Sequence, residues 1–260
     1  MKTRMYSALI ASLASVSIAF AAPNADEIMT RSYGLAKADD MASTMTMTLK
    51  QANGATKVRK LRTFMKKTAA GTDSLAEFIS PADIAGTKFL TIGNKVEGDS
   101  QRLYMPALGK IRKIASSGKG GKFMGSELSY YDMEEHSLSE FKFSYVRTNV
   151  VQSVRNGKAV SIPCHIITSV PQKPEAPYAK MTVWVAADDF FVYRTEMFDK
   201  SGAAEKTVTV NETLTTNGVI VAVRTSVESV SGNSTLIQSE KMQLNAGISP
   251  DIFSIKNLEK

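Results

Sequence analysis

The chain has 260 residues, of which 43% are apolar, and a formal net charge of +7 at pH 7. This composition is typical of a folded globular protein and excludes a disordered tail or a membrane-embedded bundle. A single cysteine, Cys164, excludes an intramolecular disulfide, and two histidines, His136 and His165, leave little material for a zinc site or a histidine-based triad. Beyond the N-terminus, no apolar run reaches the roughly 18 residues that a membrane-spanning helix needs.

Residues 1–21 are interpreted as a signal peptide. Lys2 and Arg4 form a positive start, residues 5–18 form a short apolar stretch, and a small-x-small cleavage site ends at Ala21. An uncleaved anchor is the alternative, but the apolar stretch is too short to span a bilayer. No cysteine lies near the cleavage site, so we expect no lipid anchor. The sequence therefore predicts cleavage near Ala21 and a soluble periplasmic protein.

The next stretch, from Asn24 to about Lys37, has the pattern of an amphipathic helix. Asn24 is the expected N-cap, and Glu27 completes a capping box. Residues 41–50 then alternate methionine or leucine with threonine, which is the period-2 pattern of a strand with one buried face. Asn53-Gly54 predicts a hairpin turn, with 57–66 as the partner strand.

The rest of the chain indicates β-structure. Strands are predicted at 72–80, 87–93, 101–106, 141–154, 158–170, 179–187, 190–199, 204–213, 218–230 and 234–244, with turn residues between them. A short helical or loop insertion is expected near 81–86 and again at 115–135. Strands and helices do not alternate, so a parallel α/β fold is excluded. We predict a mainly β, antiparallel meander that forms one domain over residues 22–260.

Catalytic motifs are missing from the sequence. There is no Gly-x-Ser-x-Gly motif and no phosphate-binding loop. Cys164 and His165 are neighbours on a predicted strand and point to opposite faces, so they cannot easily meet as nucleophile and base. The run Glu134-Glu135-His136 is interpreted as a solvated turn. We therefore predict a protein that is not an enzyme, with no metal, cofactor or catalytic residue.

Residues 101–132 are rich in cations and glycine. Residues 101–126 contain no acidic residue. The apolar pair Phe123-Met124 directly follows the last cation of the stretch. The segment is either simply solvated or receives an anion such as a phospholipid headgroup, and we favour the second interpretation. Nucleic acid is disfavoured as a partner. The cations are Arg102, Lys110, Arg112, Lys113, Lys119 and Lys122.

Three segments carry a family resemblance. Residues 80–90 (SPADIAGTKFL), 102–114 (RLYMPALGKIRKI) and 123–126 (FMGS) resemble the outer-membrane lipoprotein-sorting protein family, the LolA/LolB-like periplasmic carriers of lipids or lipoproteins. The resemblance covers essentially the whole chain after residue 21 and points to an uncharacterised branch of the family. It implies a strongly curved antiparallel sheet, a half-barrel, whose concave face is covered by a helical lid and binds acyl chains.

The resemblance and the strand alternation together define the expected site. Abundant methionines suit a pocket that adapts to its guest, although plain core filling is the alternative. We expect the cations above to form a basic rim with Phe123 and Met124 as an apolar flap. The expected partners are acyl chains of lipids or lipoproteins, an anionic membrane surface and a membrane protein of the inner or outer membrane. The alternative function is an accessory or sensor subunit of an exporter or envelope-stress system. The expected cavity residues are Met45, Met47, Leu49, Leu61, Phe78, Leu90, Leu103 and Met105.

Overall fold

The computed structural model describes residues 23–259, so the predicted signal peptide lies outside the described residues. The first element is α1 (Ala25–Tyr33), which the Asn24 side chain caps by accepting from the backbone N–H groups of Asp26 and Glu27. The helix is shorter than the sequence predicts, because Gly34 ends it. Its buried residues, among them Ile28 and Met29, pack against β-strands further along the chain.

Within residues 23–259, thirteen strands form one sheet, and antiparallel pairing dominates it. The first hairpin joins β1 (Asp40–Lys50) to β2 (Thr56–Lys67), which confirms the turn at Asn53-Gly54. Gly54 has a φ of +88°, a conformation that glycine adopts without steric cost, and Asn53 Oδ1 accepts from the Ala55 N–H. The sheet continues through β3 (Thr72–Ser80), β4 (Lys88–Ile92), β5 (Ser100–Met105) and β6 (Lys110–Lys113) to its edge.

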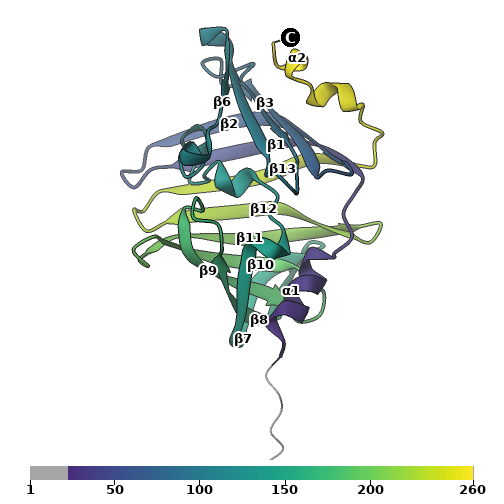
Figure 1. The fold of residues 1–260 in the computed structure, drawn as a ribbon, viewed down its shortest axis with the longest axis vertical. Helices are drawn as coiled ribbons and strands as arrows, with labels where there is room; N and C mark the ends of the chain where they lie inside the picture. Colours follow the sequence, from purple (N-terminus) through teal and green to yellow (C-terminus); the bar gives the residue numbers. More distant parts are fainter. Residues whose placement is uncertain (1–22, 260) are drawn as a thin grey trace, which may run out of the picture.

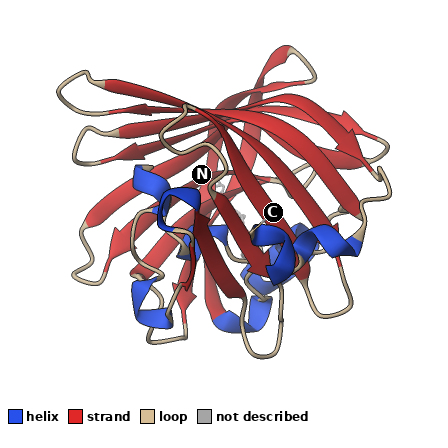
Figure 2. Ribbon diagram, turned by 90° about the horizontal axis from the view of Figure 1, so that it is seen from above, coloured by secondary structure: helices blue, strands red, loops and turns tan. Residues whose placement is uncertain are grey.

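The other half of the sheet comes from the C-terminal part of the chain. Long strands β11, β12 and β13 lie side by side, and β13 pairs with β1, so the first and last strands meet in the middle of the sheet. Figure 1 shows this arrangement, and Figure 2 shows how strongly the strands curve. The bounds are β7 (Phe141–Arg155), β8 (Lys158–Pro171), β9 (Tyr178–Ala186), β10 (Val192–Asp199), β11 (Ala204–Thr216), β12 (Val219–Ser229) and β13 (Ser234–Leu244).

The strand β11 joins the two halves of the sheet next to a second apolar core. On one side β11 pairs with β12, and on the other it pairs first with β10 and then with the end of β7. The apolar cluster at this junction takes buried residues from β7 to β10, including Cys164 and Trp184, with Val210 of β11 packed against it. The helix α1 covers the opposite face of β8 and β9.

The connection between β6 and β7, residues 114–140, is named here the covering segment. It contains short 3₁₀ helices at Ser116–Gly118, Phe123–Gly125, Tyr131–Met133 and Leu138–Glu140. In Figure 1 it is the teal stretch that lies in front of the middle of the sheet. The expected helical lid is not confirmed, because the α-helices of residues 23–259 are α1 and a short α2 (Ile255–Leu258).

Strands β3 and β4 have buried side chains on both faces. The face under the covering segment, named here the inner face, carries Phe78, Phe89 and Leu103. The opposite, outer face carries Leu75 and Leu90, against which the C-terminal residues Phe253 and Leu258 pack. Because both of its faces are covered, β4 is close to a continuous hydrophobic run rather than an alternating one.

Candidate ligand-binding cavity

The covering segment is held on the inner face by an aromatic cluster. Phe123 is 1% exposed, and its ring lies 5.0 Å from Phe89 and 5.8 Å from Tyr130, centroid to centroid. The Arg59 guanidinium donates a hydrogen bond to the Met124 carbonyl oxygen, which joins the same turn to β2. Such aromatic pairs add about 0.5–1.5 kcal/mol each beyond the area they bury. Phe123 is therefore a core residue that fixes the segment.

Beside this cluster lies a cavity of about 460 Å³, named here the methionine cavity. Its floor is the inner face of β1 to β4, and its roof is the covering segment. The apolar part of the lining includes thioethers, which are flexible and fit guests of varied shape. These lining residues include Met45, Met47, Leu61, Met65, Ala76, Phe89, Phe123, Leu128, Met133 and Ile237.

One end of the methionine cavity is polar and hydrogen-bonded. Glu135 accepts from Lys37 Nζ at 2.7 Å with one carboxylate oxygen and from the Thr72 hydroxyl at 2.7 Å with the other. Its backbone N–H donates to Asp99 at 3.0 Å. Desolvation raises the pKa of Glu135, but the hydrogen bonds from Lys37 and Thr72 outweigh it and hold the pKa below its usual value. The ionised Glu135 carboxylate thus links the covering segment to β3.

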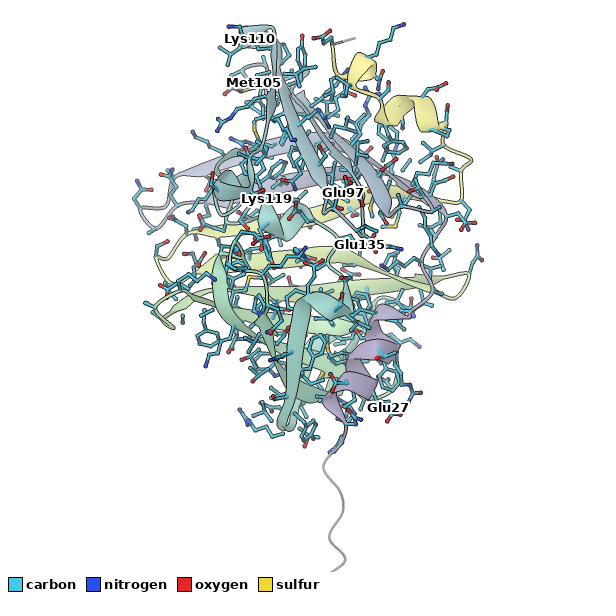
Figure 3. All side chains as sticks on the ribbon, in the orientation of Figure 1. Glu27, Glu97, Met105, Lys110, Lys119 and Glu135 are labelled. Atoms are coloured by element: carbon cyan, nitrogen blue, oxygen red, sulfur yellow. The ribbon has the colours of Figure 1, made fainter. Side chains whose placement is uncertain are left out.

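A second cavity, of about 520 Å³, adjoins the first at Glu135. The two share Lys37, Met65, Thr72 and Glu135 in their linings. The second cavity lies under the stretch that follows α1 and extends to Leu244 and Val219. Figure 3 places Glu135 near the middle of the molecule, where the two spaces meet.

A buried ion pair anchors the covering segment to the sheet. Lys206 Nζ of β11 lies 2.6 Å from Asp132 Oδ2, with 4% and 6% of the two side chains exposed. Lys206 also donates to the Glu127 carbonyl oxygen, and the Tyr178 hydroxyl donates to Asp132 Oδ1 at 2.7 Å. Burial, and then the Asp132 charge, raise the pKa of Tyr178. Both charges are fully partnered, as buried charges need to be.

Seven of the eight predicted cavity residues lie in one inner-face cluster. Met47, Leu49, Leu61, Phe78 and Leu103 are buried members, and Met45 and Met105 pack against them. Three of these, Met45, Met47 and Leu61, line the methionine cavity. Leu90 is different, because it points to the outer face toward Phe253 and Leu258. Its neighbour Phe89 occupies the inner position instead. Ligand binding by these residues stays a prediction.

The predicted basic rim is not assembled as one surface. Lys119 lies 2.5 Å from Glu134, and Lys122 lies 2.7 Å from Glu127, so these two cations are paired. Figure 3 shows Lys110 at the upper end of the molecule and Lys119 nearer its middle. Arg102 sits opposite Leu90 on the outer face. Exposed and close together are Lys110, Arg112 and Lys113, all on the edge strand β6.

The predicted flap also differs from the structure. Phe123 is buried in the inner cluster, and Met124 packs against it with a φ of 48°. The glycines beside them make close approaches: a Cβ on Gly120 would lie 3.3 Å from Pro177. The glycines of the covering segment therefore allow close packing against neighbouring residues, in addition to giving the backbone conformational freedom.

The sequence pattern does not predict several of the residues that line the two cavities. The run Glu134-Glu135-His136 is not a solvated turn, because both glutamates line the methionine cavity and His136 lines the second one. Burial raises the pKa of Glu134 above its usual value, against the effect of Lys119. The bonding partners of Glu135 come from distant parts of the chain, so no local pattern marks them.

Thiol chemistry at Cys164 and metal binding have little support in the described part of the chain. Cys164 is fully buried, and desolvation raises the pKa of its thiol to about 11. His165 faces the other way, with its ring 6.0 Å from that of Tyr145. Among residues 23–259, no group of three His, Cys, Asp or Glu side chains is placed to hold a metal ion. The same residues include no helix long and apolar enough to cross a membrane.

Solved structures share this fold. A domain from Vibrio parahaemolyticus described as an outer membrane lipoprotein-sorting protein is 25% identical, with a TM-score of 0.82 over 91% of this chain and 98% of that one. A DUF1329 family protein from Desulfovibrio piger is also 25% identical, with a TM-score of 0.80 over 90% and 97% of the two chains. A LolA superfamily protein from Nitrosomonas europaea is 15% identical, with a TM-score of 0.69 over 91% and 100%. No curated protein matches the chain.

The curved sheet, its covered inner face and these likenesses define a protein of the LolA-like class. A family model with the description "Uncharacterized protein" matches residues 70–260. The chain belongs to that family and has the LolA-like fold. The resemblance read from residues 80–126 of the sequence is thereby confirmed.

Proposed function

We propose that the protein is a non-enzymatic periplasmic carrier that binds acyl chains of lipids or lipoproteins in the methionine cavity. The observation that supports this most is the apolar lining of a cavity of about 460 Å³ roofed by the covering segment. The Vibrio parahaemolyticus neighbour is described as a lipoprotein-sorting protein, and the proposal extends that role to this chain. Export to the periplasm follows from the predicted signal peptide over residues 1–21.

The energetics suit a carrier. Each CH₂ group removed from water contributes about 0.8 kcal/mol, so even part of an acyl chain provides several kcal/mol of binding free energy. Ordering the chain and opening the segment offset much of this gain. The net affinity is then moderate, which allows a partner in the inner or outer membrane to accept the cargo.

The test compares two single substitutions on β1. Met47 faces the methionine cavity, whereas Thr48 is the next residue and faces the other side of the sheet. Native mass spectrometry of protein purified from the periplasm should detect bound lipid in the native protein and in Thr48→Glu. Met47→Glu should lose it, because a carboxylate in an apolar cavity is desolvated by the ligand. Circular dichroism checks that both variants are folded. Lipid retained equally by both variants, or absent from the native protein, contradicts the proposal.

A further inference from the structure

The inner face carries a polar row beside the methionine cavity. Ser74 of β3 pairs with Thr91 of β4, and Thr91 pairs with Gln101 of β5. Directly opposed residues in an antiparallel sheet point to the same face, with their Cβ atoms about 4.5–5.5 Å apart. Ser74 and Thr91 line the cavity. A row of three hydrogen-bonding side chains thus crosses the inner face next to its apolar residues.

Two atoms of this row lack partners. Thr91 is 2% exposed and Gln101 is 0% exposed. Within residues 23–259, neither Thr91 Oγ1 nor Gln101 Oε1 has a hydrogen-bond partner, although Gln101 Nε2 donates to the Tyr130 carbonyl oxygen at 2.8 Å. The Tyr130 bond fixes the amide, so its oxygen is the free end. Buried polar atoms without partners are uncommon in folded proteins and need an explanation.

The two unpartnered atoms have complementary requirements. Gln101 Oε1 only accepts, so its partner must be a donor, while the Thr91 hydroxyl both donates and accepts. A carboxylate or an ester carbonyl has no proton for Gln101. A ligand hydroxyl fits, because it donates its proton to Gln101 Oε1 and accepts the proton of Thr91 Oγ1.

We propose that the methionine cavity takes an apolar ligand that carries a hydroxyl group, that Thr91 hydrogen-bonds this hydroxyl at the cavity wall, and that Gln101, which lies next to Thr91 just outside the cavity lining, accepts its proton. The inference rests on the proposed carrier function and specifies its ligand class. The hydroxyl can belong to a hydroxylated acyl chain or to a ring alcohol. Both have an apolar body for the methionine side chains and one donor for Gln101.

The experiment uses matched ligand pairs. Affinities of the delipidated protein are measured for 16-hydroxypalmitate against palmitate and for cholestanol against cholestane. At least one hydroxylated ligand should bind about tenfold more tightly than its partner, which is the effect of one buried hydrogen bond of about 1.4 kcal/mol. The pair that shows the preference identifies the ligand body. Equal affinities within both pairs overturn the inference and leave the carrier function standing, whereas no binding of any of the four overturns the carrier function.

Substitutions in the cavity wall test whether Thr91 causes the preference for the hydroxylated ligand. Thr91→Val keeps the shape and removes the hydroxyl, so the preference should disappear, while Thr91→Ser should keep it. Thr63→Val is the matched control, because Thr63 lines the same cavity but already donates to the Ser43 carbonyl oxygen at 3.5 Å. Without ligand, Thr91→Val should melt at the same temperature or higher, since it removes an unpartnered polar atom. A preference that survives Thr91→Val overturns the inference.

Discussion

At the residue scale, alternation predicts which side chains meet only where one face is apolar. Met45 and Met47 alternate with threonines, and they lie on the inner face as expected. In β4 the pattern is lost, because Phe89 and Leu90 are both buried, one on each face. A strand covered on two sides has no period-2 signal, so the assignment of Leu90 to the inner face was wrong. Glu135 and Thr72, 63 positions apart, have no local signal at all.

Cys164 provides a prediction at the same scale. Its thiol is buried in the junction cluster, and a pKa of about 11 keeps it protonated at neutral pH. An aromatic disulfide reagent should therefore leave the native protein unlabelled and label one thiol after denaturation. Cys164→Ala should lower the free energy of unfolding by about 1–2 kcal/mol and leave lipid binding unchanged. Rapid labelling of the native protein, or loss of lipid binding in a folded Cys164→Ala variant, would contradict a structural role.

At the element scale, long strands and the first hairpin are predictable, whereas short elements are not. The strand β6 is four residues long and reads as part of a basic loop, because three of its residues are cations. Exposed cations are one of the ways in which an edge strand avoids pairing with other chains. The C-terminal stretch that places Phe253 on the outer face has no periodicity long enough to mark it. Packing against β3 and β4 gives these elements their structure.

The anchor of the covering segment gives a second prediction. Lys206→Met leaves Asp132 buried without its cation, and it should lower the free energy of unfolding by about 3–5 kcal/mol. The double variant with Asp132→Leu should recover much of this loss, because a buried pair replaced by apolar residues is often neutral. Urea titrations of the single and double variants measure the coupling. Additive losses in the double variant would show that the pair is not an energetic unit.

At the scale of the whole molecule, the fold class is predictable from the sequence, but the strand order is not. The mainly β class, the single curved sheet and the LolA-like resemblance are confirmed, whereas the meander holds only within β1–β6, β7–β10 and β11–β13. The pairing of β1 with β13 joins residues nearly two hundred positions apart, and local propensity contains no information about such a contact. The same holds for the two adjoining cavities, since their walls come from strands and loops along most of the chain.

The charge distribution gives a third prediction. We propose that the cations of β6 draw the protein to anionic membranes. Each contributes about 1 kcal/mol near such a surface, and the attraction should fall at 1 M salt, where the Debye length is about 3 Å. Replacing Lys110, Arg112 and Lys113 by glutamine should reduce co-sedimentation with anionic vesicles.

A control triple separates position from net charge. Glutamine at Lys158, Lys200 and Lys241 removes the same charge from exposed sites on other strands and turns. This control should sediment with anionic vesicles almost as the native protein does, and neither triple should affect the response to neutral vesicles. Equal losses in the two triples would show that total charge, rather than β6, directs the attraction.

The thioether lining of the cavity also exposes the protein to oxidants. Met45 and Met133 are only partly buried at the wall of the methionine cavity, so we expect peroxide to reach their sulfur atoms. Conversion to the sulfoxide turns a flexible apolar group into a polar one, and reductases reverse it. Oxidised protein should release an apolar cargo that reduced protein retains. A cavity built from methionine thus couples cargo retention to the redox state of its surroundings.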